Sequence, residues 1–97
     1  MSSKPETILE EADRIVHGPR QESYGHPRDD FAKQAKVWTG LLLDLLKPGV
    51  EIPPERVPLL FIGTKLCRHT NVRKRDNRVD CIGYILTDEM LDEPEDI

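Results

Sequence analysis

The residues best suited to chemistry lie in two short runs in the C-terminal half of the chain. Lys65 and Arg68 are three positions apart, and Asp76, Asp80 and Tyr84 follow at intervals of four. Residues three or four apart share one face of a helix, so the runs predict a basic patch and an acidic stripe that ends in a phenol. This pattern suits a structural ion-pair seam, and it equally suits the floor of a phosphate or nucleotide site.

The two interpretations differ in whether the positive charges are neutralised within the fold. Lys65 and Arg68 lie in the most apolar segment, where a cation without a partner would be costly to desolvate. Their simplest partners are Asp76 and Asp80, and if the seam is buried, Asp80→Ala should cost about 3 kcal/mol or more. The functional interpretation leaves part of this charge free for phosphate oxygens. The planar guanidinium of Arg can donate two parallel hydrogen bonds to them, and the ammonium of Lys acts as a point charge.

Asp76 and Asp80 also match part of a magnesium site. Mg²⁺ prefers oxygen ligands, and two carboxylates four residues apart on a helix can share one ion. The neighbouring cations would compete for the same oxygens, and a metal site usually has more carboxylates or a bound phosphate. We name Mg²⁺ as the candidate cofactor of these two residues and assign no catalytic residue.

A compact loop at residues 24–27 carries a second group of candidates. Gly25 is expected to adopt a positive φ or to allow a close backbone approach. Tyr24 and His26 would then project at defined angles, as a stacking ring and a titratable imidazole at a pocket mouth. The structural alternative is a packed turn in which Tyr24 plugs the end of a helical bundle.

The elements that must position these residues are helices. Apolar residues recurring at intervals of three and four predict helices over about residues 5–17, 27–46, 54–68 and 76–91. Ser3 and Glu6 would form a capping box for the first, and Pro58 would mark either a bend in the third or the point where its regular helix starts. The short link between the third and fourth predicts antiparallel neighbours. We expect an all-α, four-helix, bundle-like domain over residues 1–91 and an acidic, disordered tail over residues 92–97.

Composition excludes several classes of function. The chain has 97 residues, 33% of them charged, with a net charge of −4. One domain is expected at this length, and an acidic chain is not a general nucleic-acid coat. No run approaches the roughly 20 apolar residues of a membrane span, and the polar N-terminus shows no signal peptide. Cys67 and Cys81 lack metal-ligand spacing and are expected to be reduced thiols in a cytoplasmic protein.

Assembly is predicted from one crowded segment of the second helix. Five leucines, at positions 41, 42, 43, 45 and 46, cover more of that helix than one small bundle can hide. A wide apolar patch normally marks an interface, and symmetric dimers are the commonest closed solution. We therefore expect a homodimer, or a larger oligomer built from dimers, with the second helix at its centre, which Leu43→Glu should disrupt if that side chain faces the partner.

These motifs together resemble a small helical domain of unknown function that is common in tailed phages. The resemblance covers about residues 8–91 and includes the run from Arg20 to Pro27, Phe31 and Trp38, with the two charged runs above. It implies a phage-encoded protein that acts in the host cytoplasm. The helical arrangement is also distantly similar to MazG-like all-α nucleoside triphosphate pyrophosphohydrolases, which hold Mg²⁺ with ExxE and ExxD motifs. Lys65 and Arg68 stand where that family has ExxE.

Three functions follow from this reading. The first is binding of a nucleotide or another phosphate ligand, by Tyr24, His26, Lys65, Arg68, Asp76, Asp80 and Tyr84. The second is a non-enzymatic interaction module that binds a copy of itself or a host protein and whose charged seam is structural. The third is a MazG-like pyrophosphohydrolase. A concave pocket with free charge at Lys65 favours the first function, and a closed seam favours the second.

Overall fold

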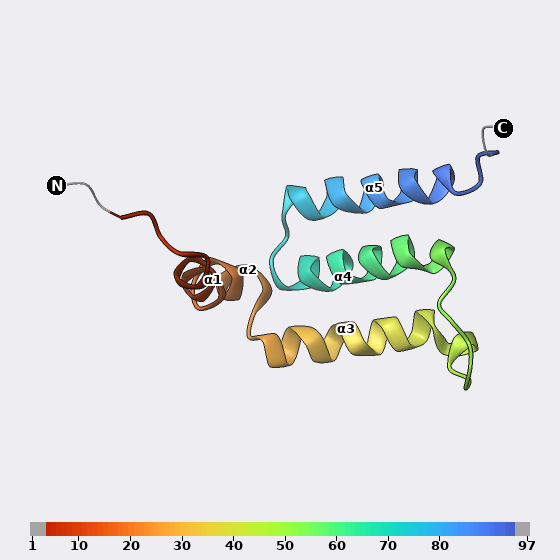
Figure 1. Cartoon of the computed structure of the whole chain (residues 1–97), viewed down its shortest axis with the longest axis horizontal. Helices are drawn as coiled ribbons and strands as arrows, with labels where there is room; N and C mark the ends of the chain where they lie inside the picture. Colours follow the sequence, from red (N-terminus) through yellow and green to blue (C-terminus); the bar gives the residue numbers. More distant parts are fainter. Residues whose placement is uncertain (1–3, 95–97) are drawn as a thin grey trace.

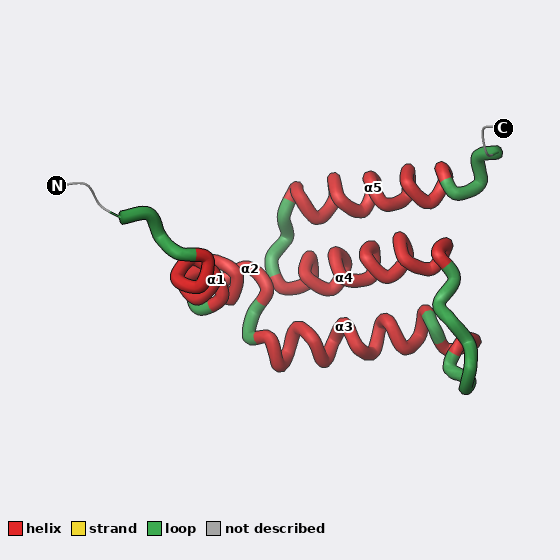
Figure 2. Tube along the Cα trace, viewed as in Figure 1, coloured by secondary structure: helices red, strands yellow, loops and turns green. Residues whose placement is uncertain are grey.

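The computed structural model describes residues 4–94, which are helical and contain no strand, as the sequence predicts. The α-helices are α1 (Ile8–Val16), α2 (Pro19–Tyr24), α3 (Pro27–Leu41), α4 (Val57–Asn71) and α5 (Arg75–Met90). Two 3-10 turns, Leu43–Leu45 and Pro54–Arg56, lie in the connection between α3 and α4. Four of these helices are the predicted ones, and the short α2 occupies what we expected to be a connector (Figure 2).

Three of the helices form a single layer. α4 lies between α3 and α5, and each runs antiparallel to its neighbour along the chain (Figure 1). The predicted antiparallel pairing of the last two helices is therefore confirmed. α1 and α2 form an arm at one end of this layer, and the chain measures 57 × 37 × 30 Å along its principal axes. Within residues 4–94, no helix is long and apolar enough to cross a bilayer.

The contact between α3 and α4 depends on a glycine. A Cβ on Gly63 would lie 3.0 Å from Val37 Cγ1 and 3.3 Å from Leu41 Cδ1, so the two helices pack closely at this point. Leu60 and Cys67, three and four residues away on the same face of α4, are buried here. This narrow seam forms the centre of the apolar core, and it holds the polar side chains of α3 and α4 in fixed register.

α3 ends five residues earlier than predicted. Its last residue is Leu41, whose carbonyl accepts a hydrogen bond of 2.8 Å from Arg56 Nη1. The same guanidinium makes two hydrogen bonds, of 2.8 and 2.9 Å, to the carboxylate of Asp44. Arg56 thus caps the helix and fixes the turn that follows it. The leucine run is consequently split between a helix end and a 3-10 turn, and only Leu43 and Leu46 of the five are exposed.

The starts of α1 and α4 are each marked by one residue. Thr7 caps α1, and its hydroxyl accepts from the backbone N–H of Glu10 in a capping box. Our expected capping residue, Ser3, lies outside the described residues. Pro58 occupies the first turn of α4, where a helix needs no backbone donor, so of the two predicted alternatives it marks the start of the regular helix and not a bend.

Candidate functional site

The predicted ion pair between the last two helices is present. Lys65 Nζ on α4 lies 2.8 Å from Asp80 Oδ2 on α5. The lysine side chain is 19% exposed and the aspartate side chain 42% exposed, so water reaches the carboxylate side of the pair. This pair is a closed contact at the edge of the layer, as the structural interpretation requires.

Arg68 pairs with a residue that the sequence did not indicate. Its Nε lies 3.9 Å from Asp30 Oδ2 on α3, and neither Asp76 nor Asp80 reaches it. Asp30 is 7% exposed and its other oxygen accepts a 2.9 Å hydrogen bond from Gln34. The Arg68 Nε atom is buried and has no hydrogen-bond partner within residues 4–94. Our expectation that both cations pair with α5 is therefore wrong for Arg68.

Tyr24 gathers three cations around its ring. The guanidinium carbon of Arg68 lies 4.1 Å from the ring centre, that of Arg20 lies 5.2 Å away, and Lys74 Nζ lies 6.0 Å away. Cations are attracted to the face of an aromatic ring at such distances. Tyr24 therefore plugs the junction of α2 and α4, as the structural interpretation predicted, and also holds positive charge there.

The loop before α3 is fixed by its backbone. Gly25 has a φ of 78°, which confirms the predicted positive value. Asn71 at the end of α4 donates a 2.7 Å hydrogen bond to the carbonyl of Ser23 and so ties the loop to the layer. His26 caps α3, because its Nδ1 accepts from the N–H of Arg28 at 3.1 Å. The structure thus gives His26 a capping contact and places it outside the pockets described below.

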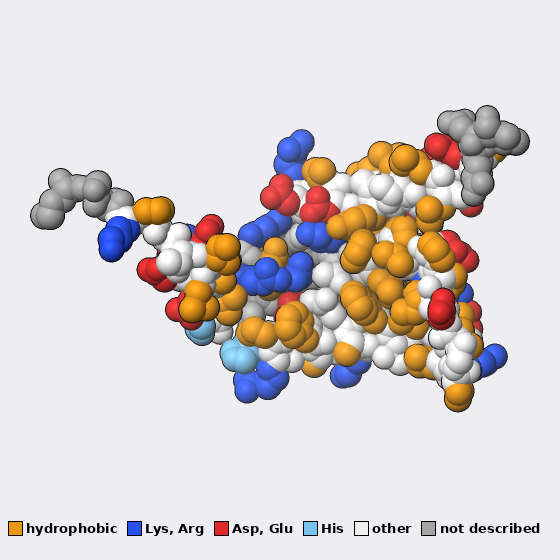
Figure 3. All heavy atoms as spheres, in the orientation of Figure 1, with side chains coloured by type: hydrophobic (Ala, Val, Ile, Leu, Met, Phe, Trp, Pro, Cys, Tyr) orange, Lys and Arg blue, Asp and Glu red, His pale blue; other side chains and the backbone are white. Residues whose placement is uncertain are grey.

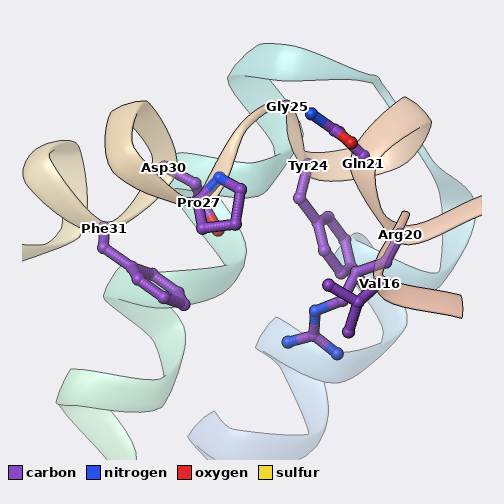
Figure 4. A pocket seen from close by; sticks show the side chains of 8 residues that line it. All are labelled: Val16, Arg20, Gln21, Tyr24, Gly25, Pro27, Asp30 and Phe31. Atoms are coloured by element: carbon purple, nitrogen blue, oxygen red, sulfur yellow. The ribbon is translucent and has the colours of Figure 1, made fainter. Parts of the chain in front are cut away.

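A small pocket lies at the base of the arm. It has a volume of about 220 Å³ and opens between α1, α2 and the start of α3 (Figure 4). The figure shows the ring of Tyr24 beside Arg20 and Val16, with Phe31 across the opening. Its lining is mainly apolar, and Asp30 contributes a carboxylate.

A second pocket lies over α3, α4 and α5 and combines aromatic, polar and cationic side chains. It has a volume of about 310 Å³ and is lined by Gln34, Trp38, Phe61, Thr64, Lys65, Arg68 and Tyr84. Tyr84 and Phe61 stack at 5.1 Å between ring centres. Among the predicted site residues, the structure therefore brings Lys65, Arg68 and Tyr84 together in this phosphate-pocket candidate, hereafter the α3–α5 pocket.

Hydrogen bonds hold the polar lining of the α3–α5 pocket in place. Trp38 Nε1 donates to the hydroxyl of Thr64 at 3.2 Å, and that hydroxyl donates to Gln34 Oε1 at 3.0 Å. Gln34 in turn donates to Asp30, which faces Arg68. A continuous chain of hydrogen bonds thus connects the indole of Trp38 to the carboxylate of Asp30, which lies 3.9 Å from Arg68 without a hydrogen bond to its Nε.

The predicted magnesium residues are only partly assembled. Asp80 is occupied by Lys65, and Asp76 is exposed in the first turn of α5 without an ion pair in the described part of the chain. Residues 4–94 contain no group of three or more His, Cys, Asp or Glu side chains placed to hold a metal. Both cysteines are free thiols, as expected, and burial raises the pKa of Cys67 and of Cys81.

Several residues of the site were not predicted as such. Asp30 looked like an ordinary acidic residue of a helix start, and Gln34 and Thr64 carried no motif. Lys74 belongs to the basic run at residues 73–75, and its ammonium donates to the hydroxyl of Ser23. Its place on a short link between two predicted helices was the one available signal of this contact.

Comparison with known proteins identifies similar sequences in phages. The family described as "Domain of unknown function (DUF6378)" matches residues 7–91. The "Gene 55 protein" of Mycobacterium phage D29 is 39% identical over 80 residues, which are 81% of this chain and 49% of that protein. That of Mycobacterium phage L5 is 33% identical over 91 residues, 93% of this chain and 55% of that protein. The chain thus spans about half the length of these relatives. No solved structure matches.

Proposed function

The chain belongs to the family of the domain of unknown function DUF6378, and for this phage-type member we propose binding of a nucleotide or a similar phosphate ligand in the host cytoplasm. In this proposal, Arg68 receives phosphate oxygens at the α3–α5 pocket, and Lys65 joins it only by exchanging its 2.8 Å contact with Asp80 for the ligand. The aromatic residues of the same pocket receive the apolar part of the ligand.

The observation that carries this proposal is the composition of one pocket. Two cations, three aromatic rings, an amide and a hydroxyl line a space of about 310 Å³. Small-molecule sites combine an apolar lining with a few fixed polar groups and begin at about this size. Aromatic rings stack on bases, and Arg and Lys bind phosphate, so this combination suits a nucleotide better than it suits a purely apolar ligand.

The surroundings of Arg68 support the same assignment. Its guanidinium lies over Tyr24, and its nearest carboxylate, Asp30, is 3.9 Å away and already accepts from Gln34. Arg68 is therefore held in one orientation by groups that leave its charge only loosely neutralised. A guanidinium in that condition gains more from a phosphate than one already held in a close bidentate pair does.

The alternative function is a non-enzymatic interaction module. The 2.8 Å contact between Lys65 and Asp80 favours it, because this half of the charged seam is closed. Under this alternative, Arg68 and the polar chain through Gln34 serve only to align the helices. The two functions differ in whether removal of the Arg68 charge affects ligand binding or stability alone.

A MazG-like pyrophosphohydrolase is the third proposal. It would require Asp76 and Asp80 to hold Mg²⁺, and Lys65 lies 2.8 Å from one of these carboxylates. Binding of a magnesium–nucleotide complex would have to displace that ammonium. Nucleotide hydrolysis in the presence of Mg²⁺ but not of EDTA, abolished by Asp80→Asn, would establish this activity.

Trp38 provides a direct test of phosphate binding. It is the single tryptophan of the chain and lines the α3–α5 pocket, so its fluorescence reports on occupation of that pocket. Titration with inorganic triphosphate and with the four deoxynucleoside triphosphates should change this fluorescence saturably. The change should be absent from the Asp30→Asn/Arg68→Gln double variant, in which a buried carboxylate is not left alone. No saturable change in the wild type, or an equal change in both proteins, would reject the proposal.

A further inference from the structure

One side of α5 carries an apolar stripe whose side chains the rest of residues 4–94 leaves more than half exposed. Val79, Ile82, Leu86 and Met90 follow at intervals of three and four, and each is between 51% and 61% exposed. α5 contacts α4 through the opposite side, which carries Asn77, Asp80 and Tyr84. Because α5 is the edge helix of the layer, the stripe faces away from the protein's own core (Figure 1).

The surface of the single chain is larger than a protein of this size normally exposes. Its accessible area is 8043 Å², against roughly 5,700 Å² for a monomer of this mass. Its radius of gyration is 17.5 Å, against roughly 12.5 Å for a compact domain of this length. Part of the excess lies on the arm, where α1 buries no residue. The excess of roughly 2,400 Å² is comparable with what one partner of an obligate dimer buries.

Charged residues lie beside the stripe near both ends of α5. Arg75 and Arg78 lie at its N-terminal end together with Asp76, and Glu89 lies at its C-terminal end, with Glu93 in the turn that follows α5. Figure 3 shows basic and acidic side chains together at the end of α5 near the arm, hydrophobic ones in the middle of the upper edge, and acidic ones towards the other end. Such a surface is complementary to itself when it is turned end to end.

We propose that two copies of this chain form a twofold dimer in which their α5 helices pack antiparallel along this stripe. A twofold interface is self-complementary, so residue i of one copy meets residue j of the other and the reverse also holds. In the register centred between Ile82 and Leu86, these two residues face each other across the axis. Val79 then lies opposite Met90 of the second copy.

The same register places unlike charges together. Arg78 lies beside Glu89 of the second copy, and the twofold axis repeats this pair. Antiparallel packing also sets the positive end of each helix dipole beside the negative end of the other. A second copy therefore satisfies both the apolar stripe and its charged ends, whereas a parallel arrangement would bring like charges together.

This interface differs from the one expected from sequence. The sequence placed the leucines at positions 41–46 at the dimer centre, on the assumption that one helix displays them all. α3 ends at Leu41 and the remaining leucines lie in a turn, so that continuous face does not exist. The most regular exposed stripe belongs to α5.

Sedimentation equilibrium at micromolar concentration separates the two locations. The wild type should sediment at twice the chain mass of 11.1 kDa. Ile82→Glu should give a monomer, because it places a carboxylate on the axis, while Leu43→Glu should remain a dimer. Both residues are more than 60% exposed, so circular dichroism should show that both variants fold. A monomeric wild type, or a dimer that Leu43→Glu breaks and Ile82→Glu does not, would overturn the proposal.

Charge reversal tests the antiparallel register itself. Arg78→Glu and Glu89→Arg should each weaken dimerisation at least tenfold, because each brings like charges together. The double variant should recover most of that loss, since the pair is restored with the charges exchanged. Single variants that dimerise as the wild type does, or a double variant no better than either, would reject this register. These outcomes do not depend on whether the α3–α5 pocket binds phosphate.

Discussion

The guanidinium of Arg68 lies 4.1 Å from the ring centre of Tyr24, although the two residues are far apart in the sequence. This contact joins the last residue of α2 to the last turn of α4. Arg20 and Lys74 approach the same ring, so one aromatic side chain brings three positively charged side chains together. The contact therefore connects the stability of the loop to the geometry of the proposed phosphate site.

The ring of Tyr24 should matter more than its hydroxyl. Tyr24→Leu removes the face on which Arg68 rests and should lower the free energy of unfolding by about 1–2 kcal/mol. Tyr24→Phe keeps that face and should stay within about 0.5 kcal/mol of the wild type. Urea denaturation measures both values. Equal losses in the two variants would show that the hydroxyl, not the cation contact, determines stability here.

The ion pair between Lys65 and Asp80 should contribute modestly to stability. The aspartate is 42% exposed, so Asp80→Ala should lower the free energy of unfolding by about 1 kcal/mol, less than the 3 kcal/mol expected of a buried seam. A double-mutant cycle with Lys65→Met measures the coupling, which should fall further in high salt. A salt-independent loss of 3 kcal/mol or more would show that the pair behaves as a buried one.

Gly63 should be required for close packing of α3 on α4. Alanine there gains helix propensity but brings its Cβ within 3.0 Å of the stiff Val37 side chain. At Gly40, by contrast, nothing lies within 4 Å of a new Cβ. Gly40→Ala should therefore stabilise the protein by about 1 kcal/mol, and Gly63→Ala should be about 1–3 kcal/mol less stable than Gly40→Ala. Thermal denaturation of the two variants compares them, and equal melting temperatures would contradict the packing argument.

The pair of Asp44 and Arg56 should make stability depend on acid pH. Hydrogen bonds from Arg56 lower the pKa of Asp44 from an ordinary value of 3.8 to about 2. A lowered folded pKa stabilises the fold above the unfolded pKa, and this contribution is lost as the pH falls from about 4 to about 2. Asp44→Asn should remove that part of the pH dependence of unfolding. If the loss of stability at acid pH is the same in this variant as in the wild type, other carboxylates cause it.

The sequence predicted the elements better than their contacts. Periodic apolar residues correctly located four helices, and regular spacing on two antiparallel neighbours was enough to predict that Lys65 meets Asp80. The partner of Arg68 could not be predicted in the same way. Asp30 lies on a different helix, and the rotation of α3 about its axis is set by packing around Gly63 and Trp38, which a sequence pattern does not specify.

The other differences arise from single tertiary contacts. α3 stops at Leu41 because Arg56, 15 residues later, binds its carbonyl. α2 forms although Gly18 and Pro19 normally stop a helix, because Pro19 also suits the first turn of a new one. The side chain of Lys74 turns towards α2 because it contacts Ser23 and Tyr24 there. Each of these differences depends on a contact between two segments of the chain, and local secondary-structure propensity contains no information about such contacts.

The most direct test of the proposed function is calorimetric titration of the wild type and of Arg68 variants with deoxynucleoside triphosphates and inorganic triphosphate. The wild type should bind at least one of these ligands, and Asp30→Asn/Arg68→Gln should bind it at least tenfold more weakly, since a charged hydrogen bond to phosphate is lost. Arg28→Gln, which removes an exposed arginine distant from the pocket, should bind as the wild type does. Binding that is absent from the wild type, or equal in all three proteins, would contradict the assignment of Arg68 as the phosphate-binding residue.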